Sequence, residues 1–461
     1  MKQLRVEEVR SIALGWRLSL GMDTMVTGVS IDSRTAGPGD VFVAIRGENF
    51  DGHNFLAQAA QAGCVTALVQ RDSKVPKDIC QAFPGGVIGV ADTVRALADL
   101  ACHQRKSISG SVVGVTGSNG KTTVKCMIDH ILKTRYRGLA SPKSFNNEIG
   151  VPLTLLDTDG GEDYVICELG TNAPGEIANL ARISEPDIAV ITMVAPVHLE
   201  KLKSIERIAA EKASILGGLR SRGLGIVNAD HELLDRSVRA YDRRLVRFGE
   251  SSSAELRLSG YQTTGAGCRF ELNSRLWVEM PIPGKHNAIN ALAAIGVAQR
   301  FGFGQEESAR ALADFAGVTM RLQALPSGGV QVFNDAYNAN PSSMLAAADV
   351  LVDSPAERRI FIAGDMLELG QSSPQLHEQL GADLAGKGFD LIVGIGELGS
   401  LVARAAAGAG AEAQDFADLD AAIAELPGQI QPGDVVLVKG SRAMRMEQLA
   451  EAINRHFGTD S

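Results

Sequence analysis

The sequence predicts an α/β protein with three domains, and three observations support this fold class. The chain has 461 residues, enough for about three domains of ordinary size. From Val41 onward, short apolar runs alternate with helical patterns, which is typical of parallel sheets with helices on both faces. The alternation starts again near residue 318, after a long helical stretch. We therefore expect domains over residues 1–86, 87–317 and 318–461.

The first domain is expected to be a small α/β unit. Apolar runs at 41–45, 65–70 and 87–90 have the β-branched composition of strands. A helix is expected over 51–62, because Gly63 follows its last apolar residues. An amphipathic stretch, 91–105, then leads into the central domain.

The central and C-terminal domains are expected to hold mostly parallel sheets. Strand-like runs at 163–170, 186–194 and 223–230 alternate with helical segments such as 205–216. A more irregular stretch, 256–280, predicts an antiparallel excursion. In the last third, helices are expected to begin near Ser342, Pro374, Leu398, Leu419 and Met444. This pattern predicts a central P-loop ATPase-like domain and a Rossmann-like C-terminal domain.

The stretch "VVGVTGSNGKTT" predicts a phosphate-binding loop. An apolar strand ends near Val115, a turn follows, and a helix begins after Gly120. Gly117 and Gly120 permit positive φ and close backbone approach, Lys121 offers a charge to phosphate, and Thr122 offers a hydroxyl to magnesium. The glycine spacing is shorter than in a strict P-loop. An ordinary glycine-rich turn is the alternative.

Composition narrows the classes of function. The net charge of −9 argues against a nucleic-acid or anionic-membrane partner. The six cysteines show no C-x-x-C spacing, which suggests reduced thiols. The N-terminus lacks a signal-peptide core, and no apolar run reaches 18 residues. We expect a cytoplasmic protein without stable membrane association.

Several polar residues follow predicted strands, where such folds bind ligands. Glu168 and His198 could complete a magnesium site near the phosphate loop, although a surface glutamate and a helix-start histidine would look the same. From the residues alone, Lys212 is better explained as a solvated helix-face lysine. Asn287 and Asn290 could cap a helix or contact a base, and capping would explain one of them.

The C-terminal third adds two features. Arg321 follows the central domain and could reach back to a γ-phosphate. The stretch "VFNDAYNANP" crowds Asp335, Asn338 and Asn340 at a strand end, with Pro341 as the expected first residue of a helix. A structural turn is the alternative for this stretch.

Taken together, these motifs resemble those of the Mur ligase family, the ATP-dependent amide-forming enzymes of peptidoglycan precursor synthesis. The loop "TGSNGKT" has the short form of that family, and "SFNNEIGVPLTLL", "ELG", "HLE", "EKASI", "GKHNAINALAA", "MRLQ" and "NDAYNANP" occur in the family's order. The resemblance extends along nearly the whole chain. Phe145 stands where leucine usually precedes the paired asparagines.

The resemblance implies ATP and Mg²⁺ as cofactors and assigns roles to individual residues. The loop residues Gly117, Ser118, Asn119, Gly120, Lys121, Thr122 and Thr123 would hold ATP phosphates. Thr122 and Glu168 would bind one magnesium, and His198 would bind a second with Lys212 in the form of a carbamate. Asn287 and Asn290 would face adenine, Asp335 the ribose, and Arg321 the γ-phosphate. Catalysis would depend on Lys121, His198, Lys212 and Arg321.

The resemblance also implies the substrates. "IDSRTAGPGDVFVAIRGENFDGHNF", "AGDMLELG" and "VKGSRAMRME" are most similar to the ligase that adds D-alanyl-D-alanine to UDP-N-acetylmuramoyl-tripeptide, an enzyme type that is commonly monomeric. The uridine diphosphate part would lie in the first domain, against Ser33, Arg34, Gly47, Asn49, Asp51, Gly52 and His53. Asn146 and Asn147 would contact the peptide, and the remaining substrate contacts would come from Tyr337, Asn338 and Asn340.

Three alternatives are kept. Another Mur-type ligase would differ in the amine that it adds. A folylpolyglutamate-synthase-like ligase would share the phosphate loop but would have no use for the first-domain motif. A P-loop ATPase coupled to partner binding should carry an aspartate after the apolar strand that here ends in Glu168.

Overall fold

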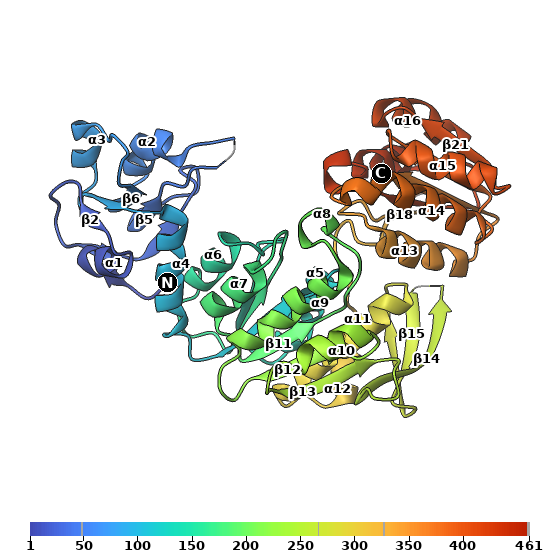
Figure 1. Cartoon of the computed structure of the whole chain (residues 1–461), viewed down its shortest axis with the longest axis horizontal. Coiled ribbons are helices and arrows are strands. Elements are labelled where there is room, and N and C mark those ends of the chain that lie inside the picture. The colour runs from blue at the N-terminus through green and yellow to red at the C-terminus, as the bar shows by residue number, and fades with distance from the viewer. Residues whose placement is uncertain (48, 266, 326–327, 459–461) are drawn as a thin grey trace.

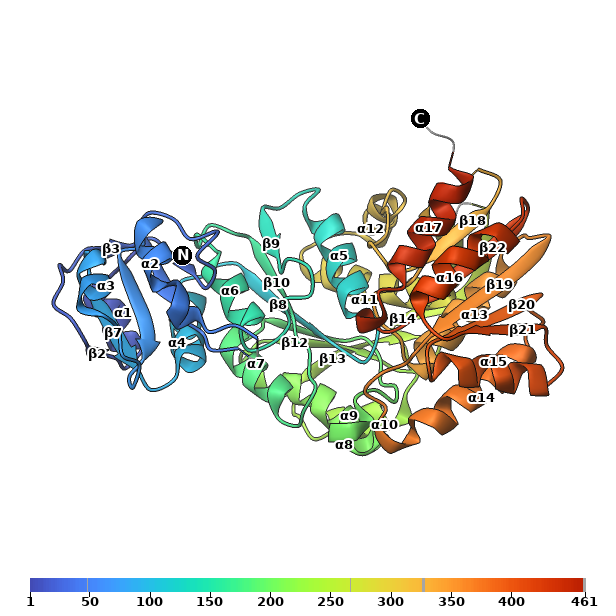
Figure 2. The same ribbon diagram turned by 90° about the horizontal axis from the view of Figure 1, so that it is seen from above.

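The computed structural model describes residues 1–47, 49–265, 267–325 and 328–458. Three α/β bodies follow one another along the chain, with the central body between the other two (Figures 1 and 2). Each contains a largely parallel sheet, as the sequence predicts. Among the described residues, no helix is long and apolar enough to cross a membrane.

The N-terminal body contains a five-stranded sheet. Its order is β2 (Trp16–Arg17), β7 (Val87–Val90), β6 (Thr66–Gln70), β5 (Asp40–Val43) and β4 (Gly28–Ser30). A two-stranded ribbon, three short helices and one 3-10 turn accompany it: β1 (Leu4–Arg5), β3 (Met25–Val26), α1 (Val6–Ile12), η1 (Gly52–Phe55), α2 (Leu56–Gln61) and α3 (Lys77–Ala82). The sheet extends past residue 86, where we expected the domain to end, because β7 fills the place between β2 and β6.

Helix α4 (Thr93–Arg105) joins this body to the central one. It packs against α1 on one side and against α6 (Gly150–Leu156) and α7 (Glu176–Ser184) on the other. Buried residues of the two bodies form one continuous apolar cluster through it. The cation of Arg105, 1% exposed, is held by Asp187 at 2.8 Å and by the Ser184 carbonyl at 2.7 Å. The first two domains therefore share a core.

The central sheet has nine strands. In spatial order they are β16 (Leu276–Met280), β15 (Gly267–Leu272), β14 (Leu256–Thr264), β13 (Arg244–Gly249), β12 (Leu224–Asn228), β11 (Ile188–Ile191), β8 (Ser111–Thr116), β10 (Tyr164–Glu168) and β9 (Gly138–Ala140). Strands β14 to β16 pair antiparallel, which confirms the predicted excursion, and the other pairings are parallel.

Helices cover both faces of the central sheet. Alternate strand residues contribute to different apolar clusters, Val112 and Val165 to one and Val113 and Ile166 to the other. Helices α6, α7 and α9 (Ile205–Ala213) lie on the first face, and α5 (Lys121–Leu132), α11 (Lys285–Arg300) and α12 (Gln305–Leu312) on the second. The short helices α8 (Leu199–Leu202) and α10 (Glu232–Val238) complete this body.

The C-terminal sheet has six strands and the predicted doubly wound form. Its order is β17 (Gln323–Leu325), β18 (Gln331–Asn334), β22 (Asp434–Lys439), β19 (Arg358–Gly364), β20 (Leu391–Ile395) and β21 (Ala413–Phe416). Helices α13 (Pro341–Asp353), α14 (Ser373–Ala385) and α15 (Gly399–Gly408) cover one face, and α16 (Leu419–Glu425) and α17 (Glu447–Phe457) the other. Pro341 is the first residue of α13, as predicted.

Candidate active site

A cavity of about 870 Å³ lies between the central and C-terminal domains. Its walls come from the loops that follow β8, β10, β11 and β18, together with the start of α11. These loops leave the carboxyl ends of parallel strands, which is where ligands bind in doubly wound folds. The phosphate loop predicted from the sequence forms part of the wall through Ser118, Asn119, Gly120 and Lys121.

The phosphate loop has the backbone that its glycines predict. Gly117 has φ of 149° and Gly120 has φ of 82°. A Cβ on Gly117 would come within 1.9 Å of Thr192 Oγ1, and one on Gly120 within 2.5 Å of Asn290 Oδ1. Ser118 fastens the loop to the neighbouring strand end, because its Oγ donates to the Ala195 carbonyl at 3.0 Å. The loop is therefore fixed before any phosphate binds.

Lys121 and Glu168 occupy the floor of the site. Lys121 Nζ donates to the Gly117 carbonyl at 2.9 Å, and burial lowers the pKa of this lysine while the charge of Glu168 opposes the shift. Glu168, 1% exposed, accepts from Thr122 Oγ1 at 2.9 Å and from Asn146 Nδ2 at 3.0 Å. Cations and hard oxygen ligands thus stand side by side, as binding of a phosphate and a divalent ion requires.

Arg321 belongs to the C-terminal domain and contacts Thr122 of the central domain across the cavity. Its Nη2 donates to Thr122 Oγ1 at 2.9 Å, and its guanidinium carbon lies 4.1 Å from the centroid of the Tyr337 ring. Its Nε is buried and has no hydrogen-bond partner in the described part of the chain. A buried donor without a partner is costly, and an anionic oxygen in the cavity would satisfy it.

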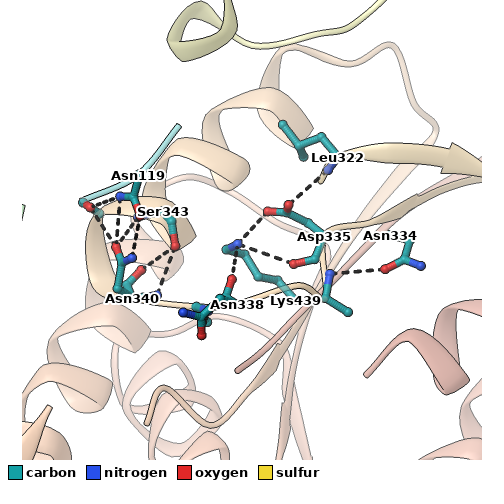
Figure 3. A network of polar contacts seen from close by, with 11 residues as sticks. Asn119, Leu322, Asn334, Asp335, Asn338, Asn340, Ser343 and Lys439 are labelled. Atoms are coloured by element: carbon teal, nitrogen blue, oxygen red, sulfur yellow. Dashed lines mark hydrogen bonds and ion pairs between the residues drawn. The ribbon is translucent and has the colours of Figure 1, made fainter. Parts of the chain in front are cut away.

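Asparagines join the phosphate loop to the C-terminal domain. Asn340 Nδ2 donates to Asn119 Oδ1 at 2.7 Å (Figure 3), and Asn119 Nδ2 donates to Ser342 Oγ at 2.9 Å. Asn340 also caps α13, because its Oδ1 accepts from the Ser343 amide at 3.0 Å. One side chain therefore starts a helix and contacts the other domain.

Asp335 lies beside this contact with both oxygens engaged (Figure 3). Lys439 Nζ lies 2.7 Å from its Oδ2, and the Leu322 amide donates to its Oδ1 at 3.0 Å. Lys439 also donates to the Asn338 carbonyl at 2.9 Å. The polar turn predicted at this strand end is held by a buried lysine from the adjacent strand β22.

Asn287 and Asn290 lie on the first turns of α11 and line the cavity. Asn287 Nδ2 donates to the Pro283 carbonyl at 2.7 Å, and Asn290 Nδ2 donates to Asn287 Oδ1 at 3.4 Å. The helix begins at Lys285 without a side-chain cap. Helix capping, which we considered sufficient for one of them, therefore explains neither.

His198 lies close to the C-terminal domain. It follows β11, whereas Glu168 ends β10, and these strands flank β8 from opposite sides instead of being neighbours. His198 Nδ1 lies 2.6 Å from Glu368 Oε2, and the imidazole contact holds the pKa of that carboxyl below its ordinary value.

Lys212 is buried, so the solvated helix-face interpretation is wrong. Its side chain on α9 is 1% exposed. Burial lowers the pKa of Lys212 well below its usual value, and the nearby charge of Lys121 adds to the shift. A buried amine in this environment favours the neutral, nucleophilic form.

The remaining predicted residues of the central domain, and Tyr337 of the C-terminal domain, also line the cavity. Asn146 and Asn147 line the cavity, and Asn147 Oδ1 also accepts from the Gly150 amide at 2.9 Å, at the start of α6. Thr123 and Tyr337 line the wall as well. Asn147 thus has a structural partner of its own.

The predicted residues of the first domain lie outside this cavity, whose lining among the described residues runs from Ser118 to Lys439. Arg34 is paired with Asp32 at 2.6 Å, next to the partly exposed Ser33. Asp51 accepts from the His53 amide at 3.0 Å, and His53 Nε2 accepts from the Gln70 amide at 2.9 Å. His53 Nδ1 therefore carries the ring proton toward Asp51, 2.6 Å away.

The loop between these residues is a tight turn. The Gly47 amide donates to the Phe50 carbonyl and the Gly52 amide to the Ile45 carbonyl, both at 2.8 Å, and Asn49 is exposed at the tip. Glu48 of the same motif lies outside the described residues. A second cavity, of about 560 Å³, lies beside this region and is lined by Arg46, Gln70, Arg71, Asp72 and Ala91.

Sequence reasoning missed three residues of the site. Lys125 is 2% exposed and lies 3.4 Å from Glu168 Oε2, and its Nζ donates to the Ser141 carbonyl at 2.8 Å. Its position one helical turn after Lys121 was a usable signal. Lys439 and Glu368 gave no such signal, because their partners are known only once the strand order and the domain contact are known.

The described residues contain no group of three His, Cys, Asp or Glu side chains arranged to hold a metal ion. Protein atoms alone therefore do not complete a metal site here. Thr122 and Glu168 fit magnesium nevertheless, because this ion prefers hard oxygens, accepts few protein ligands and takes the remaining ones from substrate phosphates and water.

Family models match three consecutive segments of the chain. The description "Mur ligase family, catalytic domain" matches residues 25–105, "Mur ligase middle domain" matches 115–298, and "Mur ligase, glutamate ligase domain" matches 320–442. A UDP-N-acetylmuramoyl-tripeptide--D-alanyl-D-alanine ligase of Bacillus subtilis (strain 168) is 34% identical over 93% of both chains. The chain belongs to the Mur ligase family.

Further relatives agree with this membership. The ligase of the same name from Escherichia coli (strain K12) is 34% identical over 95% of each chain. A crystal structure of MurF from Acinetobacter baumannii superimposes with a TM-score of 0.90 at 30% identity, over 99% of both chains. A Thermotoga maritima MurF in complex with ADP gives a TM-score of 0.83 at 27% identity, over 94% of this chain and 98% of that one.

Proposed function

We propose that this chain is an ATP-dependent ligase that joins D-alanyl-D-alanine to UDP-N-acetylmuramoyl-tripeptide, giving UDP-N-acetylmuramoyl-pentapeptide, ADP and phosphate. The observation that carries this proposal is that Lys121 and Arg321, from two domains, both line one cavity with Glu168, with Arg321 bonded to the hydroxyl of Thr122 that Glu168 accepts from. The names of the relatives supply the substrates.

The division of labour follows the three bodies. The N-terminal domain, extended to include β7, would hold the uridine diphosphate end, the central domain to about residue 317 would hold ATP, and residues 318–461 would hold D-alanyl-D-alanine. Two arginines, Arg46 and Arg71, line the smaller cavity beside the Asp51–His53 pair and suit the negative charge of a diphosphate. Ser33, Arg34 and the turn that carries Gly47, Asn49 and Gly52 would form the rest of that site.

ATP would lie in the larger cavity with its phosphates on the loop from Gly117 to Thr123. The backbone amides of the loop, Lys121 and the unpartnered Nε of Arg321 favour an anion there. Asn287 and Asn290 would face adenine. Asp335 would reach the ribose only by exchanging one of its present contacts with Lys439 and Leu322.

Magnesium would be held by Thr122 and Glu168, with His198 supporting a second ion. When bound, it would supply positive charge that offsets repulsion between the phosphate oxygens and the incoming carboxylate. Lys125 Nζ, 3.4 Å from Glu168 Oε2, would help to hold that carboxylate in place beside Thr122.

Lys212 would serve as a carbamate. An amine with a strongly lowered pKa reacts with carbon dioxide, losing a proton and gaining a carboxylate, so a cation that would repel a metal becomes an anion that supports one. The burial of Lys212 beside Lys121 is the observation that supports this assignment.

The reaction would proceed without a nucleophilic side chain. A carboxylate oxygen of the tripeptide attacks the γ-phosphorus and ADP leaves, while Lys121 and Arg321 stabilise the charge that develops on the phosphoryl oxygens. The amine of D-alanyl-D-alanine then attacks the acyl carbon, and phosphate leaves with the former carboxylate oxygen. Docking of the C-terminal domain would exclude water, which would otherwise hydrolyse the acyl phosphate.

Tyr337, Asn338 and Asn340 would border the acceptor amine, and Asn146 and Asn147 the peptide. We also propose that the enzyme acts in the cytoplasm, where ATP and UDP-linked precursors occur, as a monomer without nucleic-acid or stable membrane partners. It would serve peptidoglycan synthesis and hence cell wall biogenesis, cell shape and cell division.

The alternatives predict different chemistry. A folylpolyglutamate synthase of Mycobacterium tuberculosis shares the fold, with a TM-score of 0.62 at 19% identity, and that likeness extends no further than the fold. A partner-coupled ATPase would hydrolyse ATP without an amine acceptor. Another Mur-type ligase would prefer a single amino acid.

Phosphate release tests the proposal directly. The assay would contain UDP-N-acetylmuramoyl-tripeptide, ATP and Mg²⁺, and would vary the amine among D-alanyl-D-alanine, D-alanine, lysine and diaminopimelate. Among these four amines, we expect rapid turnover only with D-alanyl-D-alanine. Equal turnover with a single amino acid, or without any amine, would refute the assignment.

A further inference from the structure

One contact between the central and C-terminal domains joins a histidine to a carboxylate. His198 Nδ1 lies 2.6 Å from Glu368 Oε2, and both residues line the large cavity. The side chain of His198 is 21% exposed and that of Glu368 59% exposed, so the contact lies at the mouth of the cavity and not in a core. A partly exposed contact between a histidine and a carboxylate contributes little to stability, so this one needs another explanation.

The loop that carries Glu368 is held firmly. The Met366 amide donates to Nε2 of the fully buried His377 at 2.9 Å, and the Leu367 amide donates to Ser441 Oγ at 2.8 Å. His377 Nδ1 lies 2.6 Å from the Ser373 carbonyl, which fixes the ring. Glu368 itself has φ of 64°, a left-handed conformation that a non-glycine residue adopts only where its surroundings determine it.

The opposing segment is shaped in a similar way. His198 has φ of 51° and precedes the single turn of α8, and Lys203, which follows the helix, has φ of 70°. The 3-10 turn η3 (Gly370–Ser372) packs on α8, and a Cβ at Gly370 would come within 3.3 Å of Glu200 Cα. Two constrained backbone segments thus meet at close range and bring the imidazole and the carboxylate together.

We propose that Glu368 is a positioning residue that orients His198 and so couples docking of the C-terminal domain to completion of the second metal site. This inference rests on the proposed function, in which His198 supports a second magnesium. A histidine that binds a metal through one ring nitrogen usually donates from the other to a carboxylate or carbonyl. With Nδ1 held by Glu368, Nε2 would be the ring nitrogen left to bind the metal.

The two residues of this contact belong to different domains, so the contact exists only when the domains are docked. His198 belongs to the central domain, whereas its carboxylate partner belongs to the domain that would bind D-alanyl-D-alanine. When the domains separate, His198 loses its orienting partner. The second metal site would then be complete only in the docked enzyme. This would prevent the acyl phosphate from forming before the amine is enclosed.

Metal binding by the full-length protein tests this coupling without any catalytic step. Free Mn²⁺ would be measured by electron paramagnetic resonance in the presence of a non-hydrolysable ATP analogue, for the wild type, Glu368→Gln, His198→Ala, the double variant and Glu397→Gln. Glu397 is an exposed carboxylate of the same domain and serves as the matched control.

We expect two Mn²⁺ per wild-type chain. Glu368→Gln should weaken the second ion about tenfold or more, as loss of an orienting carboxylate usually does. The double variant should bind Mn²⁺ no more weakly than His198→Ala, because the two residues act as one unit. Glu397→Gln should match the wild type. Small-angle scattering with the analogue present should show the same compact shape for all five proteins.

Four results would overturn the inference. The first two are a wild-type chain that binds one Mn²⁺ and a Glu368→Gln variant with wild-type affinity for both ions. The others are additive losses of Mn²⁺ affinity in the double variant and an expanded shape of Glu368→Gln in small-angle scattering, which would mean that the pair only holds the domains together. Steady-state kinetics adds a fifth. A raised KM for D-alanyl-D-alanine with Mn²⁺ binding intact would assign Glu368 to recognition of the amine instead.

The same experiment separates this inference from the proposed function. A wild type that forms the pentapeptide while Glu368→Gln binds Mn²⁺ normally would refute the coupling alone. A wild type that binds two Mn²⁺ with the analogue but makes no pentapeptide would refute the proposed substrate pair, and the Mn²⁺ affinities would still decide the role of Glu368.

Discussion

Two regions of the molecule differ in where their polar side chains find partners. One is the contact between the central and C-terminal domains, here called the seam, which includes Asn119, Thr122, Arg321 and Asn340, and the other is the set of polar loops in the N-terminal domain. At the seam, polar groups bond across the domain boundary: Asn119 to Asn340 and Arg321 to Thr122. In the N-terminal domain, Arg34 pairs with Asp32 and His53 with Asp51, each two residues away. The difference teaches that the large cavity is assembled from two domains, whereas the proposed first-domain site would be formed locally. Substitutions at the seam should therefore change rates, and those in the first domain should change substrate affinity.

The largest effect is expected for Lys212→Ala. Removing the buried amine removes the proposed carbamate, so kcat should fall by about a thousandfold or more, as for loss of a major electrostatic stabiliser. ATP affinity, measured by calorimetry, should change only a few-fold because Lys212 lies outside the cavity lining. The exposed Lys133→Ala is the control. A Lys212→Ala enzyme that turns over at the wild-type rate would rule out the carbamate.

Arg321 tests the seam from its other side. Arg321→Ala should lower kcat by about a hundredfold to a thousandfold, because a charge aimed at the transferring phosphoryl group is lost. Arg321→Lys should recover only part of that loss, since lysine lacks the planar fork that contacts Thr122 and stacks on Tyr337. Phosphate-release kinetics measure both variants. Full activity in the lysine variant would show that the geometry of Arg321 is unimportant.

Arg34 tests the first domain. Arg34→Ala should raise the KM for UDP-N-acetylmuramoyl-tripeptide by about tenfold, as expected for one charge-assisted phosphate contact, and leave kcat nearly unchanged. The Arg34 side chain is 85% exposed in its pair with Asp32, so the midpoint of thermal unfolding should not shift measurably. Arg95→Ala, which breaks another exposed pair, should change neither. A loss confined to kcat would contradict the division between the two regions.

The smallest effect concerns the pH dependence of stability. Burial lowers the pKa of His377 below its ordinary value of about 6.5, so the folded state keeps this ring neutral while the unfolded chain protonates it. The stabilisation is complete above pH 6.5 and is lost as the pH falls toward the folded pKa. The slope contributed by this one group cannot exceed about 1.4 kcal/mol per pH unit.

Hydrogen exchange of the C-terminal domain between pH 7.5 and 5.5 measures this effect. His377→Gln should be less stable at pH 7.5, because it loses the contacts to Met366 and Ser373, and should lose less stability on acidification. The exposed His456→Gln serves as the control. An unchanged slope in His377→Gln would assign the acid sensitivity to other groups.

Much of the fold could be predicted because it is encoded locally. Alternating apolar runs predict the strands, Gly117 and Gly120 predict the turn, and Pro341 predicts the start of α13. The end of the first domain was misplaced, since the sequence shows that β7 is a strand but not that it lies between β2 and β6. Strand order is a long-range property, which local patterns do not carry.

The site was predictable to the extent that its residues follow strands. Glu168 could be found because it ends a strand, and Arg321 because it follows the central domain. The burial of Lys212 could not be found, since a lysine at helical spacing is usually solvated. Lys439 and Glu368 are recognised only through partners more than a hundred residues away. The domain contact that brings Glu368 to His198 is a property of the folded chain alone.

The transfer of oxygen from the tripeptide to phosphate tests the central claim most directly. The carboxylate that receives D-alanyl-D-alanine would be labelled with ¹⁸O and the reaction run to completion, with the phosphate examined by mass spectrometry. We predict one ¹⁸O atom in each phosphate and one fewer in the pentapeptide, because the attacking oxygen leaves with phosphorus. Unlabelled phosphate would contradict an acyl-phosphate ligase built around this cavity.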